Sequence, residues 1–154
     1  MIADQYIGPV LRKSITLNVL KSEEHGYNHW FRVWKNAQVL AKKTPGASLE
    51  IVALFALFHD SMRENDDDDP HHGLRGWELW TKFAEKDQLT QAQSNTLYLA
   101  CVNHSNGFTL YDPTVGVCWD ADRLDLPRVG ITPDPDLMST PTGKAIASRK
   151  IHIL

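Results

Sequence analysis

The stretch Leu49-Glu50-Ile51-Val52-Ala53-Leu54-Phe55-Ala56-Leu57-Phe58-His59-Asp60 decides the fold of this chain. It follows Ser48, a suitable N-cap, and is apolar on every side, which is typical of a central helix buried by its neighbours. His59 and Asp60 stand at the end of this helix, where two polar side chains are costly to bury unless something binds them. A divalent metal ion would compensate for that cost.

Two further helices are expected beside the central one. Apolar residues recur at three- and four-residue steps over residues 27–43, and Pro45-Gly46 then ends the pattern. His29 falls in the first turn of that helix. Large apolar side chains repeat at helical spacing again over residues 74–86.

Two more helices are expected toward the C-terminus. One is capped by Thr90 and runs to His104. The other opens at Pro113 and carries Asp120 and Asp122. No run of useful length alternates with the period of a strand. Helices therefore account for almost all of the predicted regular structure.

The helical pattern weakens at the C-terminal end. Residues 128–142 are rich in proline and are expected to form an ordered, irregular excursion, after which residues 143–153 can form one short helix. The predicted fold is all-α: one compact helical bundle over residues 1–154, with its core at about 27–125 and a proline-rich excursion at 126–154.

Composition narrows the classes of function. The 154 residues are 42% hydrophobic and 23% charged, which suits one soluble globular domain. The net charge of −3 argues against a nucleic-acid polymer as partner and favours a small substrate. The sequence has no apolar run of about 18 residues, and its N-terminus lacks the basic start and apolar core of a signal peptide. We therefore expect a cytoplasmic protein with no membrane partner.

The run Glu64-Asn65-Asp66-Asp67-Asp68-Asp69 is the strongest charge cluster, and Pro70 closes it. Its carboxylates repel one another, so we expect an extended surface loop. In an alternative interpretation Asp69, beside His71 and His72, reaches back toward a metal ion.

Three elements of the sequence occur in the order H…HD…D: His29, the doublet His59-Asp60, and the aspartate of Ala121-Asp122-Arg123-Leu124. This order resembles the signature of the HD superfamily of metal-dependent phosphohydrolases, over residues from about 27 to 125. The resemblance implies an all-helical domain whose metal ligands are His29, His59, Asp60 and Asp122.

Asp120 is the alternative to Asp122 as the last ligand. The two aspartates lie two positions apart on one predicted helix, so only one should face a metal ion while the other caps or pairs. The match of AlaAspArgLeu to the superfamily favours Asp122.

Two more histidines lie between the doublet and the last aspartate. Some members of the HD superfamily have two histidines in this interval and hold two metal ions, so the resemblance makes His72 and His104 candidates for a second ion. Alternatively, both bind the phosphate of a substrate as protonated imidazoles. His25 and His152 have no such context and are expected to be structural.

The donor set indicates which metals are suitable. Imidazole nitrogen and carboxylate oxygen suit Mn, Fe, Co, Ni and Zn and, less well, Mg. Cys101 and Cys118 lie in apolar segments and are expected to be buried, in a reducing compartment, rather than ligands. Coordination lowers the pKa of a bound water, which can then attack near neutral pH. Asp60 or Glu64 is the expected acceptor of the water proton.

Arginines supply the candidate phosphate ligands. Arg63 follows the doublet by one turn and Arg75 follows His72 by three residues, and a planar guanidinium matches phosphate oxygens. Arg32 and Arg123 are expected to pair with carboxylates behind the site.

Together these features predict a phosphohydrolase that cleaves a small phosphate ester, with nucleotides among the candidates. Two alternatives stay open: a di-iron oxygenase of the HD type, as in myo-inositol oxygenase, and a non-catalytic ligand-sensing module. A homo-oligomer is compatible with the sequence.

Overall fold

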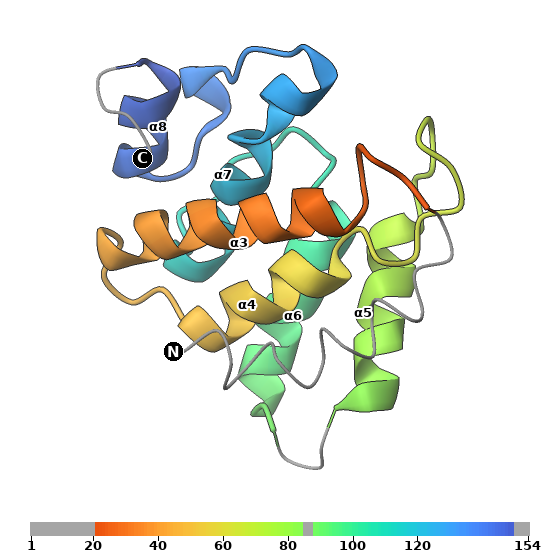
Figure 1. Cartoon of the computed structure of the whole chain (residues 1–154). Coiled ribbons are helices and arrows are strands. Elements are labelled where there is room, and N and C mark those ends of the chain that lie inside the picture. The colour runs from red at the N-terminus through yellow and green to blue at the C-terminus, as the bar shows by residue number, and fades with distance from the viewer. Residues whose placement is uncertain (1–20, 85–87, 150–154) are drawn as a thin grey trace.

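Helices form all the regular structure of residues 21–84 and 88–149, the parts of the chain that the computed structural model describes (Figure 1). In chain order they are α3 (Tyr27–Lys42), α4 (Leu49–Phe58), α5 (His72–Phe83), α6 (Gln91–Asn103), α7 (Pro113–Arg123), the 3-10 helices η1 (Leu126–Val129) and η2 (Pro135–Leu137), and α8 (Pro141–Ala147). Because these residues contain no strand, the predicted all-α class is confirmed for them.

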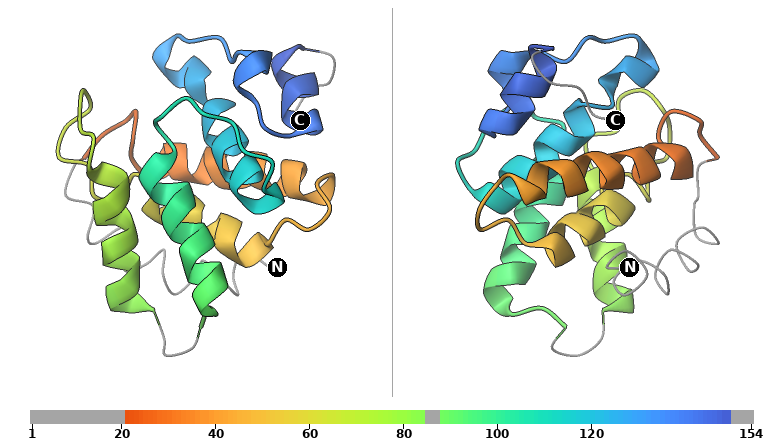
Figure 2. Two further views of the ribbon diagram at one scale, coloured as in Figure 1. Left: turned by 180° about the vertical axis from the view of Figure 1, so that it is seen from behind. Right: turned by 60° about the vertical axis from the view of Figure 1, so that its left-hand side comes forward.

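Helix α4 lies in the middle of the bundle and contacts α3, α5, α6 and α7 (Figure 1, Figure 2). Each of its residues from Ile51 to Phe58 is buried. The Ser48 hydroxyl accepts a hydrogen bond from the Ile51 amide, as an N-cap does. The prediction of a central buried helix is therefore confirmed, and its C-terminal end delivers His59 and Asp60 into the interior.

Helix α5 approaches its neighbours through two glycines. A Cβ atom at Gly76 would overlap the carbonyl oxygen of Phe58 on α4, and one at Gly73 would overlap that of Cys101 on α6. Only a residue without a side chain permits such close backbone contact. This approach brings His72, the first residue of α5, next to the ends of both neighbouring helices.

The helix bounds differ from the sequence prediction mainly around α5. The prediction placed this helix at 74–86, whereas it begins at His72 and ends at Phe83. Residues 85–87 lie outside the described part of the chain. The last helix, α8, begins at Pro141 rather than at residue 143. His152 also lies outside the described residues.

The segment after α7 folds back over one end of the bundle, where η1, η2 and α8 lie together (Figure 2). Thr140 caps α8, since its side chain accepts from the Gly143 amide. The predicted irregular excursion is thus interrupted by short 3-10 helices. Among the described residues, no helix has the length and apolar character needed to cross a membrane.

Candidate metal centre

Six polar side chains from five helices meet inside the bundle. They lie in the first turn of α3, at the end of α4, at the start of α5, at the end of α6 and on α7: His29, His59, Asp60, His72, His104 and Asp122. The first five of these residues are almost completely buried. The structure therefore brings together all four predicted metal ligands and both additional histidines.

Asp60 is the centre of this cluster. Its Oδ2 atom lies 3.4 Å from Nε2 of His29 and 3.5 Å from Nε2 of His59. Its Oδ1 atom lies 3.1 Å from Nε2 of His72 and 3.4 Å from Nε2 of His104. Each carboxylate oxygen thus faces one pair of histidines, and the carboxylate separates the two pairs.

The two Nε2 atoms of each histidine pair are close enough to bind the same metal ion. The Nε2 atoms of His29 and His59 are 3.1 Å apart, and those of His72 and His104 are 2.8 Å apart. Oδ1 of Asp122 completes the first group at 3.1 Å from His29 and 3.6 Å from His59. Nitrogen ligands about 2.1 Å from one ion lie about 3.0 Å apart when the angle between them is a right angle. Both histidine pairs fit that spacing.

Two of the rings are oriented by carbonyl groups of their own helices. Nδ1 of His59 lies 2.9 Å from the Phe55 carbonyl oxygen, and Nδ1 of His104 lies 2.6 Å from that of Cys101. A carbonyl oxygen only accepts, so Nδ1 carries the proton in each ring. The neutral ring then presents the lone pair of Nε2 to the cluster, as in histidines that bind metal ions.

The other two rings are held by residues of the surrounding loops. Nδ1 of His72 donates to the Asp69 carbonyl oxygen. Nδ1 of His29 donates to Oδ2 of Asp125 at 2.7 Å, and Arg32 binds the other oxygen of that carboxylate at 2.7 Å. All four rings therefore have Nδ1 fixed outside the cluster and Nε2 directed into it.

The carboxylates favour positive charge at this position. Burial opposes the charged form of His29, but hydrogen bonds with Asp122, Asp125 and Asp60 outweigh it and raise the pKa of His29 to about 10. Burial likewise opposes ionisation of Asp60 and Asp122, yet the histidines hold the pKa of both carboxyl groups well below the usual range. A metal cation would satisfy the same carboxylates and the facing lone pairs together.

Asp120 has a different role from Asp122. Its Oδ1 accepts from the Ser139 amide at 2.7 Å, and its Oδ2 accepts from the Thr140 amide at 2.8 Å and from the Thr140 hydroxyl at 2.7 Å. Burial raises the pKa of Asp120 despite these hydrogen bonds. Asp120 thus connects α7 to the start of α8, while Asp122 faces the histidines.

A cavity of about 310 Å³ lies against the cluster. Asp60, His104 and Asp122 line it together with residues of the segment 126–138. A small molecule in the cavity would therefore contact the candidate metal ligands. This volume is at the lower end of the range for small-molecule sites, about 300–1,000 Å³.

The two arginines predicted to bind phosphate lie in different places. Arg63 lines the cavity, where its Nε lies 3.3 Å from Oδ1 of Asp60. Arg75 is not among the residues that line this cavity, and its Nη2 binds both oxygens of Asp69 at 2.6 Å. The role of Arg75 in binding substrate therefore stays a prediction, and in this structure its guanidinium binds the Asp69 carboxylate.

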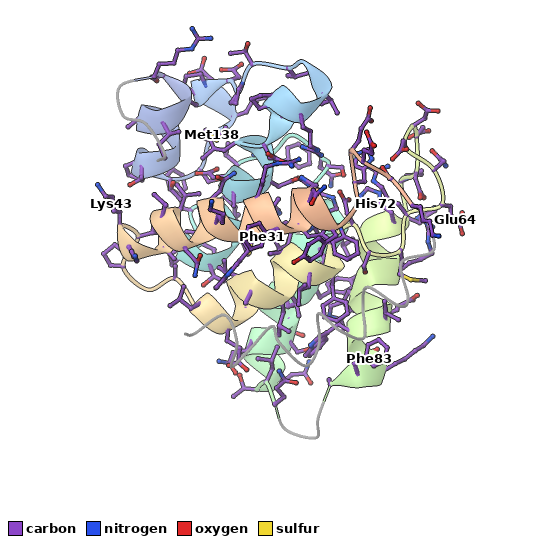
Figure 3. All side chains as sticks on the ribbon, in the orientation of Figure 1. Phe31, Lys43, Glu64, His72, Phe83 and Met138 are labelled. Atoms are coloured by element: carbon purple, nitrogen blue, oxygen red, sulfur yellow. The ribbon has the colours of Figure 1, made fainter. Side chains whose placement is uncertain are left out.

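Two acidic residues do not take the places predicted for them. The Glu64 side chain is 69% exposed on the acidic loop (Figure 3) and is not among the residues that line the cavity, so its role as acceptor of a water proton stays a prediction that this geometry does not support. Asp69 does not reach the cluster with its carboxylate, which binds Arg75 and the Glu64 amide. It contributes through its carbonyl oxygen, which orients His72.

Arg32 and Arg123 also differ from each other. Arg32 pairs with Asp125 behind His29, as expected. Arg123 hydrogen-bonds to the Leu137 carbonyl oxygen at 2.6 Å instead of pairing with a carboxylate behind the site, and it lines the cavity.

Sequence reasoning missed two residues near the centre. Asp125 orients His29, and its position three residues after Asp122 is the one signal that could have suggested this role. His25 was expected to be structural, but it lines the cavity, and its Nδ1 lies 2.6 Å from Oδ1 of Asp66. Glu24, His25 and Asp66 form a third group of potential ligands, of which Glu24 and Asp66 are exposed to solvent.

Comparisons with protein-family models, with curated proteins and with solved structures found no match to this chain. The functional interpretation therefore depends on the geometry of the centre and its cavity.

Proposed function

We propose that this protein is a metal-dependent phosphohydrolase of the HD type that binds two divalent metal ions. The observation that carries the proposal is the convergence of four imidazole Nε2 atoms on the two oxygens of Asp60. The ligands of the first ion would be His29, His59, Asp60 and Asp122, and those of the second Asp60, His72 and His104.

The donor chemistry supports a metal of the borderline class. Nitrogen and oxygen ligands suit Mn, Fe, Co, Ni or Zn, and Mg less well. Cys101 and Cys118 are buried, and burial raises the pKa of both thiols, which disfavours thiolate ligands. A soft-metal site is therefore disfavoured.

The cavity supports a small phosphate ester as substrate, with nucleotides among the candidates. Bound divalent ions lower the pKa of a coordinated water and take up charge from phosphoryl oxygens. The protein contributes the shared ligand Asp60, the fixed orientation of the four rings, and Arg63 at the cavity wall. Because each oxygen of Asp60 faces one histidine pair, Asp60 would serve as a ligand in both groups rather than as the proton acceptor.

Metal analysis combined with a phosphatase screen tests this proposal. The purified protein is expected to bind two equivalents of Mn, Co, Ni or Zn, and to release phosphate from an aryl phosphate or from members of a nucleotide and sugar-phosphate panel. In His59→Ala the bound metal should fall from two equivalents to about one, and phosphate release should disappear. The exposed His71, next to His72, offers a matched control, and His71→Ala should retain both. Two results would contradict the proposal: a wild-type protein that binds no metal, or a His59→Ala variant that hydrolyses phosphate esters as well as the wild type does.

The complete set of six ligands also favours a second candidate, a di-iron oxygenase of the HD type. Four histidines and two aspartates arranged around a shared carboxylate suit iron as well as the other borderline metals. Two irons per chain with substrate-dependent oxygen consumption and no phosphate release would favour the oxygenase.

A further inference from the structure

Arg123 is a buried cation with one unpaired nitrogen. It is the last residue of α7, directly after Asp122, and only 6% of its surface is exposed. Its Nη1 donates to the Leu137 carbonyl oxygen at 2.6 Å, which fixes the direction of the guanidinium. Its Nη2 is shielded from solvent and has no hydrogen-bond partner in residues 21–84 and 88–149.

A buried charged donor without an acceptor is unfavourable, so protein structures normally provide one from the chain, from water or from a ligand. Arg123 lines the same cavity as Asp60, His104 and Asp122. Nη2 itself is covered in this structure, so an acceptor in the cavity would reach it through a rotation of the Arg123 side chain.

Two other arginines line the cavity but have partners. Arg63 binds Asp60 and the carbonyl oxygens of Asn65 and Asp67. Arg128 donates to the carbonyl oxygens of Glu24 and Asp125. Asp60, Asp122 and Asp134 line the same cavity. Once metal ions bind Asp60 and Asp122, the three guanidinium groups would outnumber the remaining carboxylate and favour an anion. Of the three arginines, Arg123 is the one with a buried nitrogen that has no partner among the described residues.

Part of the cavity wall is apolar. The segment after α7 contributes Leu126, Val129, Leu137 and Met138 to the lining, together with the charged Arg128 and Asp134. The cavity thus combines charged groups with apolar side chains, which is the usual composition of a site for a small organic molecule.

We propose that the cavity binds a phosphate monoester, with Arg123 holding a phosphoryl oxygen and the 126–138 segment contacting an apolar part of the esterified alcohol. This inference rests on the proposed phosphohydrolase function and specifies its substrate class. Under this proposal the 126–138 segment selects the substrate, while the helices α3 to α7 supply the metal ligands.

Calorimetric binding of phenylphosphonate and of inorganic phosphate to the Mn-loaded protein tests the role of Arg123. Arg123→Gln should bind both anions about 10- to 100-fold more weakly, as expected for loss of charge-assisted hydrogen bonds. Its bound Mn should stay unchanged. Arg149→Gln removes the same charge from an exposed position and should leave both affinities unchanged.

The possible failures of the two proposals can be told apart. A wild-type protein that binds no metal contradicts the phosphohydrolase proposal itself. If Mn is bound normally and Arg123→Gln binds both anions as the wild type does, the inference about Arg123 is overturned while the phosphohydrolase proposal stands. Arg123→Met keeps the apolar stem without the charge and replaces the glutamine variant if that protein does not fold.

The apolar wall is tested with the same two probes. Val129→Ala removes two methyl groups from a partly buried side chain, and should weaken phenylphosphonate binding about threefold or more. Inorganic phosphate has no apolar part, so its affinity should stay the same. Equal effects on both probes, or no effect on either, would contradict a role for this segment in selecting the alcohol.

Discussion

The Nε2 atoms of His72 and His104 lie 2.8 Å apart, although 32 positions separate the two residues in the sequence. Because each ring donates from Nδ1 to a backbone carbonyl, both Nε2 atoms carry lone pairs when the rings are neutral. Facing lone pairs repel unless a cation or a proton lies between them. This pair therefore distinguishes a centre for two ions from a centre for one.

Loss of one member of this pair should remove only the second ion. We expect His104→Ala to lower the bound metal from about two equivalents to about one, because His29, His59, Asp60 and Asp122 still form a complete group. Elemental analysis after dialysis measures this stoichiometry, and the helical content of the variant, measured by circular dichroism, should be retained.

If the wild-type protein binds only one equivalent of metal and His104→Ala binds the same amount, His72 and His104 do not hold an ion.

Chelation should lower the melting temperature. A metal ion bound only by the native state stabilises it by mass action, about 2.7 kcal/mol at 100 times the dissociation constant. For a domain of this size that corresponds to a shift of about 5–10 °C. Thermal melts with and without EDTA measure the shift. Asp60→Ala serves as the control, because it removes the ligand that both groups share, and a variant that holds neither ion should melt equally in both conditions. An unchanged wild-type melt would contradict a metal bound within the fold.

The central helix could be predicted because its pattern is local. A run that is apolar on every side, preceded by a serine cap, requires no knowledge of its neighbours, and α4 matches it. The start of α5 could not be predicted in the same way. His72 becomes helical where Gly73 and Gly76 contact the backbones of α6 and α4, and this contact is a property of the packed bundle.

For the candidate site, the order of histidines and aspartates in the sequence identified which residues meet. It did not predict where the side chains of the residues next to them point. Glu64 and Arg75 were assigned to the site because they lie close in sequence to the doublet and to His72. Both belong to the acidic loop and its partner helix, where Asp69 attracts Arg75. Arg123 was expected behind the site, and only the fold of the following segment turns it toward the cavity.

Gly76→Ala should destabilise the protein, against the usual trend. Alanine normally stabilises a helix by about 1 kcal/mol relative to glycine. Here its Cβ atom would overlap the Phe58 carbonyl oxygen, so α5 must move away from α4, at a cost of about 1–3 kcal/mol. Urea denaturation measures the sign of the change. A more stable variant would show that the two helices are not in contact at this position.

Asp125 should affect the metal centre only through His29. Its carboxylate fixes the ring by accepting from Nδ1 and has no direct place in either group of ligands. We expect Asp125→Asn to lower metal affinity by about 10- to 100-fold, the range for residues that orient a ligand. Competition with a chromogenic chelator measures this affinity. A loss as large as that of His29→Ala would indicate that Asp125 binds the metal ion directly.

The two aspartates of α7 should show opposite effects on metal binding and on stability. Asp122→Ala removes a ligand, so metal affinity should fall by well over the ~100-fold limit of an indirect effect, with little change in the stability of the metal-free protein. Asp120→Ala removes three hydrogen bonds to residues 139–140 and should cost about 1–3 kcal/mol of stability, while metal affinity stays within ~10–100-fold of the wild type. Metal titration and urea denaturation of both variants separate the two roles. A larger loss of metal affinity in Asp120→Ala would assign the ligand to Asp120, and would require α7 to present its opposite side to the histidines.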